Sequence, residues 1–100
     1  MKYAILDKNH NLVFTDDLLE WGRWFETADR IVQQDTLPNG KFVSTVFLGL
    51  NHAFGGKPLW FETMVFPKKG DGNELDLDME RYETWNEAER GHREMVEKYK

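Results

Sequence analysis

The chain has 100 residues, which is enough for one domain with a modest core and too few for two. Hydrophobic residues make up 40% and charged residues 31%, the balance of a globular domain, and no segment is long and apolar enough to span a bilayer. The absence of cysteine excludes disulfides, thiolate chemistry and cysteine-based zinc sites. The formal net charge is −5 and the basic residues form no patch, which disfavours nucleic-acid binding through phosphates.

The N-terminal third predicts a hairpin followed by a helix. Residues 2–6 and 11–15 are short apolar runs on either side of an Asx-rich turn. A helix follows over about 16–27, capped by one of the two aspartates at its start, and its apolar face packs on the sheet. That face comprises Leu18, Trp21, Gly22, Phe25 and Ala28. Trp24 falls outside it, which makes the Trp24 ring a candidate for a rim or interface contact.

Four further segments predict the main strands. They are residues 30–36, 41–50, 58–66 and 75–83. The middle two are dense in β-branched and aromatic residues and carry apolar side chains on both faces. An antiparallel sheet with one solvated face alternates more cleanly. Either helices cover one face and a partner covers the other, or the second face lines a ligand cleft.

The last segment predicts the clearest helix of the chain. Residues 84–87 (TWNE) form a capping box, so a helix begins at Trp85 and continues over 85–99. The sequence therefore predicts a single α+β domain over residues 1–100. It consists of an antiparallel sheet of about four main strands, an N-terminal hairpin, and two helices packed on one face of the sheet.

Three strings stand out by their length: residues 43–50 (VSTVFLGL), residues 61–66 (FETMVF), and residues 82–92 with the pattern W-x-E-A-x-x-G-H. Together with the segment 20–26 (EWGRWFE), they resemble a family of small phage and prophage proteins. The resemblance implies a phage or prophage context and no assigned activity, and the family's usual aspartate before the loop histidine is Asn51 here. Because the chain starts without the apolar run of a signal peptide, we expect a cytoplasmic location, which for a phage protein is the host cytoplasm.

The loop between the two most apolar strands is the candidate binding site. Its candidate residues are Asn51, His52, Phe54, Gly55 and Gly56, with Trp24 or Trp60 as a stacking surface. The histidine ring and exposed backbone N–H groups can bind a small anion or a planar ligand. The alternative is a tight connection in which the glycines supply positive φ and His52 hydrogen-bonds the local backbone.

Two ionisable residues are predicted to be structural. Glu62 interrupts an apolar strand, so its carboxylate needs a partner, and Arg30 or Arg81 on neighbouring strands can form an ion pair with it. His92 lies in the apolar stripe of the last helix and must satisfy both ring nitrogens, for which Glu62 or Thr63 is the expected partner.

No catalytic set, metal site or cofactor motif is predicted. Glu89 and His92 have i,i+3 spacing, and His52 could add a third metal ligand, but one such pair falls far short of a metal centre. A phosphate-binding loop, a nucleophile elbow and a paired-carboxylate signature are absent from the sequence.

Two functional hypotheses remain. The first is a non-catalytic interaction module that binds a host or phage protein through the second apolar face of the sheet. The second is a protein that binds or sequesters a nucleotide-like small molecule through the 51–56 loop. A homodimer is compatible with both, because a second copy can cover the spare sheet face and form a pocket at its seam.

Overall fold

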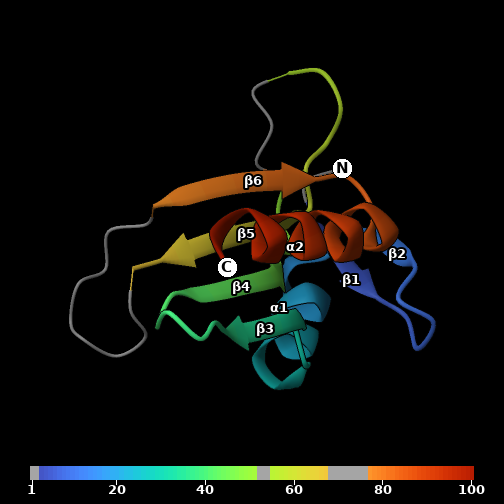
Figure 1. Ribbon diagram of the computed structural model, residues 1–100. Helices are drawn as coiled ribbons and strands as arrows, with labels where there is room; N and C mark the ends of the chain where they lie inside the picture. Colours follow the sequence, from blue (N-terminus) through green and yellow to red (C-terminus); the bar gives the residue numbers. More distant parts are fainter. Residues whose placement is uncertain (1–2, 52–54, 68–76) are drawn as a thin grey trace.

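The computed structural model describes residues 3–51, 55–67 and 77–100. Its elements in chain order are β1 (Tyr3–Leu6), β2 (Leu12–Thr15), α1 (Leu18–Thr27), β3 (Ile31–Thr36), β4 (Phe42–Phe47), β5 (Phe61–Phe66), β6 (Asp78–Tyr82) and α2 (Trp85–Tyr99). The strands β3 to β6 form a four-stranded antiparallel sheet in sequential order, and β1 pairs with β2 in a separate two-stranded sheet (Figure 1). The predicted α+β class, with its main sheet, hairpin and two helices, is confirmed.

Both central strands are shorter than the apolar runs from which they were predicted. β4 ends at Phe47, and Gly49 then adopts a φ of +75°, which lies outside the extended region. Beyond that point the chain runs beside β1, where the Ala4 N–H donates to the Gly49 carbonyl at 3.0 Å. β5 begins at Phe61, three residues after Pro58. The predicted strand over 75–83 is β6, and its first two residues lie outside the described part of the chain.

The predicted capping box starts α2 where the sequence places it. The Thr84 hydroxyl accepts a hydrogen bond from the Glu87 N–H at 3.1 Å, and the Glu87 carboxylate accepts one from the Glu83 N–H at 3.2 Å. α2 then presents Ala88, Gly91, His92 and Met95 to the sheet, and all four are buried. The helix therefore lies along one face of the sheet, as Figure 1 shows.

Strand alternation gives the main sheet two unlike faces. The face under α2 carries Val43, Thr45 and Phe47 from β4 and Phe61, Thr63 and Val65 from β5, each at most 1% exposed. Its apolar residues form two clusters, one around Phe47, Phe61 and Ala88 and the other around Val43, Val65 and Met95. Thr45 and Thr63 are directly paired in the register and lie between these clusters. The core is therefore divided by a polar row.

α1 packs chiefly on the hairpin formed by β1 and β2. Trp21 and Phe25 close over Gly49, where an added Cβ would lie 2.9 Å from the Trp21 ring nitrogen. The Trp24 ring meets Phe47 edge-on with centroids 5.6 Å apart, so α1 reaches the α2-covered sheet face at the end of β4. The expectation that Trp24 lies outside the packed face is wrong, and Leu18, expected within it, is 55% exposed. Short polar groups at the start of the helix cap it, with Asp17 accepting from two backbone N–H groups.

Among the described residues, no helix is both long and apolar enough to cross a membrane.

Candidate functional site

Only part of the predicted 51–56 site lies within the described residues. His52 and Phe54 fall outside them. The Asn51 side-chain oxygen accepts a hydrogen bond from the Leu59 N–H at 3.2 Å, which closes the base of the loop. Gly55 and Gly56 are exposed and have φ values of +86° and +71°, as expected for glycines at positive φ. The proposed ligand role of this loop stays a prediction.

Of the two tryptophans assigned to the same site, Trp60 lies in the core and Trp24 packs against it. Trp60 is 1% exposed and packs with Phe61 and Ala88, and its ring nitrogen has no hydrogen-bond partner. Trp24 is half-buried and its ring contacts Phe25 and Phe47. A stacking surface needs an exposed ring face, and Trp60 offers none in this arrangement. Trp60 therefore contributes packing to the end of the sheet.

The predicted ion pair of Glu62 is present. The Arg81 Nε donates to Glu62 Oε2 at 2.9 Å across the β5–β6 pair, and the Glu62 side chain is 12% exposed. Arg30, the other predicted partner, instead places its guanidinium 3.8 Å from the centroid of the Phe25 ring. A mostly buried carboxylate is thus neutralised by a cation on the adjacent strand, which supports a structural role for Glu62.

His92 is fully buried, and its partners differ from those expected. Its Nε2 lies 2.7 Å from Asp35 Oδ2, and its Nδ1 lies 2.7 Å from Thr45 Oγ1. The expectation that Glu62 pairs with His92 is wrong, because side chains alternate along β5 and Glu62 points to the face opposite α2. Thr63 points to the face under α2, but it is connected to His92 only through the Thr45 hydroxyl.

Thr63 nevertheless belongs to the same hydrogen-bonded chain. The Thr45 and Thr63 hydroxyls hydrogen-bond each other. The polar groups therefore form one continuous chain: Asp35, His92, Thr45 and Thr63. It runs beneath α2 from β3 across β4 to β5, and His92, Thr45 and Thr63 are 0% exposed. We call it the polar chain.

Two separate cavities flank α2, and the Asp35 end of the polar chain lies beside one of them. The first, of about 280 Å³, is lined by Gln33, Asp35, Thr36, Leu37, His92, Arg93, Val96 and Glu97. The second, of about 350 Å³, is lined by Glu80, Tyr82, Gly91, Glu94, Met95 and Lys98. One flanks α2 on its β3 side and the other on its β6 side.

Tyr82 occupies a position that only a glycine opposite it permits. A Cβ added to Gly91 would lie 2.2 to 2.3 Å from the Tyr82 ring and hydroxyl. Burial raises the pKa of the Tyr82 phenol, the negative charges of Glu80 and Glu94 raise it further, and the hydrogen bond with Thr63 acts in the opposite direction. Tyr82 is therefore a neutral phenol, able both to donate and to accept a hydrogen bond.

A second polar contact joins the edge strand to the end of α2. Asp78 Oδ2 accepts hydrogen bonds from Lys98 Nζ and from the Tyr99 hydroxyl, each at 2.7 Å. These bonds lower the pKa of Asp78 and raise the pKa values of Lys98 and Tyr99. The contact fastens β6 to the helix on the side where the second cavity opens.

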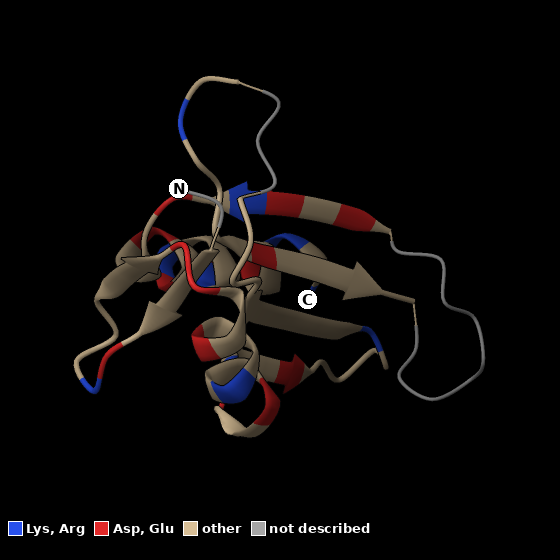
Figure 2. Cartoon of the chain, turned by 180° about the vertical axis from the view of Figure 1, so that it is seen from behind, with Lys and Arg blue, Asp and Glu red and all other residues tan. Residues whose placement is uncertain are grey.

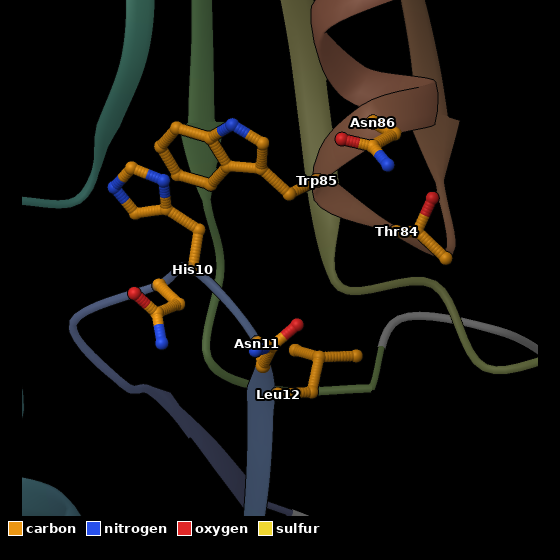
Figure 3. A pocket seen from close by; sticks show the side chains of 7 residues that line it. His10, Asn11, Leu12, Thr84, Trp85 and Asn86 are labelled. Atoms are coloured by element: carbon orange, nitrogen blue, oxygen red, sulfur yellow. The ribbon is translucent and has the colours of Figure 1, made fainter.

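A third cavity, of about 370 Å³, lies where the hairpin meets the start of α2 (Figure 3). Its lining residues are Asn9, His10, Asn11, Leu12, Thr84, Trp85 and Asn86. His10 has a φ of +65°, which costs a non-glycine residue energy, and its ring stacks on Trp85 with centroids 3.7 Å apart. Phe61 meets Trp85 edge-on. The stack thus ties the hairpin turn to α2 and to the core.

The sheet face opposite α2 carries an apolar surface, which we call the open face. Cross-strand register places Phe42, Val46, Met64 and Phe66 on it, all half-buried, together with the more exposed Ile31, Leu77 and Met79. Figure 2 views this side: no drawn helix stands in front of β5, β6 or much of β4, and β4 carries no charge. Exposed fractions of 47%, 48% and 40% for the last three residues leave apolar area in water.

Within the described ranges, no group of three or more histidine, aspartate or glutamate side chains is placed to hold a metal ion. The described part also holds the residues that sequence reasoning missed: Asp35, Thr45 and Tyr82. A signal for Thr45 was present, because Val43 and Phe47, two residues away on the same strand face, are apolar. No family model, curated protein or solved structure matches the chain.

Proposed function

We propose that this chain is a small phage- or prophage-encoded accessory protein that acts as a non-catalytic interaction module. The observation that carries the proposal is the open face of the main sheet. The phage context rests on the resemblance of the strings VSTVFLGL, FETMVF and W-x-E-A-x-x-G-H, and the binding role rests on the surface.

The register of the sheet organises the open face into rows. Phe42 pairs with Phe66, and their rings stack with centroids 6.3 Å apart. In the next row Met64 pairs with Met79. Apolar side chains in adjacent rows form a contiguous patch, whereas isolated exposed apolar residues are common on any protein and carry no meaning.

Polar groups interrupt this patch at two places. Gln34 Nε2 donates to Ser44 Oγ at 2.9 Å in the row of Met64, and the Glu62–Arg81 ion pair occupies the row of Val46. Protein interfaces combine apolar and polar groups in this way, and flexible methionine side chains adapt to a partner's shape. The partner expected here is a host or phage protein with a complementary apolar surface.

Site-specific photo-cross-linking tests the proposal. A photoreactive residue at Met79 on the open face is compared with one at Leu19 on α1, which is 71% exposed and is not one of the residues of that face. The expected result is a discrete cross-linked protein from Met79 in host extract and none from Leu19. Excess wild-type chain without the photoreactive residue should compete for the partner and reduce this cross-link. The Met79→Glu chain should not compete, because burying an unpaired charge in the interface is expensive.

Sedimentation velocity on the same proteins identifies a partner that is a second copy of the chain. A wild-type dimer that Met79→Glu converts to a monomer, while Leu19→Glu leaves it intact, places the self-contact on the open face. A wild-type monomer with equal cross-linking from both positions contradicts the proposal.

The alternative, a binder of a nucleotide-like ligand at the 51–56 loop, is tested separately. Thermal-shift measurements with nucleotides on the wild type and on His52→Ala are the direct assay, because a ligand at 100 times its dissociation constant stabilises the folded state by about 2.7 kcal/mol. A nucleotide-induced rise in melting temperature that is lost in His52→Ala favours the small-molecule hypothesis. A wild-type melting temperature that no nucleotide changes contradicts that hypothesis and favours the interaction module.

A further inference from the structure

The Asp35 end of the polar chain faces the cavity of about 280 Å³ on the β3 side of α2, which we call the β3 cavity. We propose that the β3 cavity binds a small zwitterion of the α-amino acid class, with the ammonium group of the ligand on Asp35 and its carboxylate on Arg93. The cavity lies on the α2 side of the sheet, so its occupancy is independent of what the open face binds.

The Asp35 carboxylate is fixed by two hydrogen bonds and is still accessible to a ligand. His92 Nε2 lies 2.7 Å from Asp35 Oδ2, and the ring donates this bond because a carboxylate only accepts. Gln33 Nε2 donates to the same oxygen at 2.9 Å. These bonds leave Asp35 Oδ1 open, and 41% of the Asp35 side chain is exposed. Asp35 therefore offers a positioned acceptor to an ammonium group.

The buried part of the polar chain holds His92 in the orientation that Asp35 needs. His92 Nδ1 is hydrogen-bonded to Thr45, which is hydrogen-bonded to Thr63, and all three residues are 0% exposed. Stability alone does not require these bonds, because replacing both partners of a buried hydrogen bond by apolar groups of the same shape is nearly neutral or stabilising. Supporting hydrogen bonds that lock a side chain at the wall of a cavity are typical of a binding site.

Arg93 supplies the opposite charge on the α2 side of the β3 cavity. Its side chain is exposed and forms no hydrogen bond or ion pair with another described residue. Glu97, which also lines the cavity, is already paired with Lys100 at 2.9 Å. A guanidinium group binds a carboxylate through two parallel hydrogen bonds. Because Arg93 and Asp35 share one cavity without forming an ion pair, they match a ligand that carries both charges.

The size and the walls of the β3 cavity restrict the ligand further. Its volume of about 280 Å³ lies at the lower end of ligand pockets, which span about 300–1,000 Å³, so the ligand is small. Leu37, which is 6% exposed, and the half-buried Val96 form an apolar wall beside the charged groups. An α-amino acid with an aliphatic side chain carries an ammonium group, a carboxylate and an apolar group on one carbon, which fits this combination.

Titration of L-leucine into the intact chain, followed by two-dimensional amide NMR, tests the proposal. The expected result is a saturable shift of the Asp35, Leu37 and Arg93 amides at up to about 10 mM leucine, a concentration that detects a Kd in the millimolar range. The amide of Met79 on the open face should not move. Isoamylamine and isocaproate are leucine without its carboxylate and without its ammonium group, and each should bind about tenfold or more weakly than leucine.

Two substitutions at Arg93 connect the binding to this cavity. Arg93→Gln should weaken leucine binding about tenfold or more, to the level of isoamylamine. Arg90→Gln, at an exposed position of the same helix that does not line the cavity, is the matched control and should bind leucine as the wild type does. Arg93→Glu places a second carboxylate opposite Asp35 and should bind isoamylamine more tightly than the wild type.

Asp35→Asn tests the other charge, because asparagine keeps an acceptor for His92 but does not attract an ammonium group by charge. It should weaken leucine binding to the level of isocaproate. If Asp35→Asn does not fold, the exposed Arg93 variants decide the question alone. A folded wild type whose amides do not respond to leucine, analogues that bind as tightly as leucine, or leucine binding that survives Arg93→Gln overturns the proposal.

Discussion

The two faces of the main sheet use the same strands in opposite ways. The face under α2 is almost completely buried, yet its middle row is polar, with Thr45 and Thr63 beneath His92. The open face is half in water, yet its rows are mainly apolar, with Phe66, Met64 and Met79 side by side. The expected distribution of polarity is therefore locally reversed on both sides of one sheet.

The comparison shows that buried polar groups and exposed apolar groups are stabilised in different ways. A buried hydroxyl or imidazole is tolerated only when each polar atom has a partner, and the polar chain supplies partners internally. An exposed apolar residue costs little by itself but is stabilised when another surface covers it. The covered face thus satisfies its buried polar groups internally, whereas the apolar residues of the open face would be covered by the partner that we propose.

The largest expected effect comes from removing matched aromatic rings on the two faces. Phe61→Ala empties a fully buried site beside Phe47 and Trp85 and should lower the free energy of unfolding by about 3–5 kcal/mol. Phe66→Ala, on the same strand but on the open face, should cost about 1–2 kcal/mol, because its ring is already partly in water. Urea unfolding of both variants measures the difference. Equal losses would show that the open face is as well packed as the core.

The next effect concerns neighbouring polar residues on β4. Thr45→Val leaves His92 Nδ1 buried without its partner and should destabilise the fold by about 1–3 kcal/mol, although the side-chain volume hardly changes. Ser44→Ala removes a hydroxyl from the open face, where water can replace the bond to Gln34, and should change stability by less than about 0.5 kcal/mol. Chemical denaturation at neutral pH measures the free energy of unfolding of both variants. A Thr45→Val variant as stable as the wild type would contradict the view that the polar chain must be complete.

The two-faced character of the central strands could be predicted from the sequence because strand side chains alternate with a period of two. Apolar residues at both parities of β4 and β5 indicated two faces to be covered. The Glu62–Arg81 pair could also be predicted, since a buried carboxylate needs a cation from an adjacent strand. The capping box likewise placed the start of α2, because capping is a local effect.

The partners of His92 could not be predicted, because they depend on register between distant segments. Asp35 lies 57 residues from His92 in sequence and faces α2 only because it pairs with Val43. A slip of one residue would turn Asp35 to the open face. The packing of Trp24 was missed for a related reason, since the orientation of a helix is determined by the surface it meets, here Gly49 and Phe47.

A smaller effect is expected where α2 meets Tyr82. Gly91→Ala gains about 1 kcal/mol in helix propensity, but its Cβ collides with the Tyr82 ring and hydroxyl. This overpacking against Tyr82 costs about 1–3 kcal/mol, so the net change should be a loss of about 1 kcal/mol. Gly22→Ala in α1 is the matched control, because nothing lies within 4 Å of its added Cβ, and it should be stabilising. A melting temperature of Gly91→Ala higher than that of the wild type would show that Tyr82 moves aside without cost in stability.

The smallest expected effect is a dependence of stability on alkaline pH that arises from Tyr82. Burial raises the pKa of Tyr82 in the folded protein, so the unfolded chain loses this proton first, from about pH 10. Over that interval the unfolded state binds fewer protons than the folded state, and the free energy of unfolding falls as pH rises. Tyr82→Phe has no proton to lose, so its stability relative to the wild type should improve steadily above about pH 10 and be constant below about pH 9. Urea midpoints of the two proteins at matched pH measure this difference directly, since all other titrations cancel in the comparison. A difference that stays flat through pH 10 would mean that the Tyr82 hydroxyl is as well solvated in the folded state as in the unfolded chain.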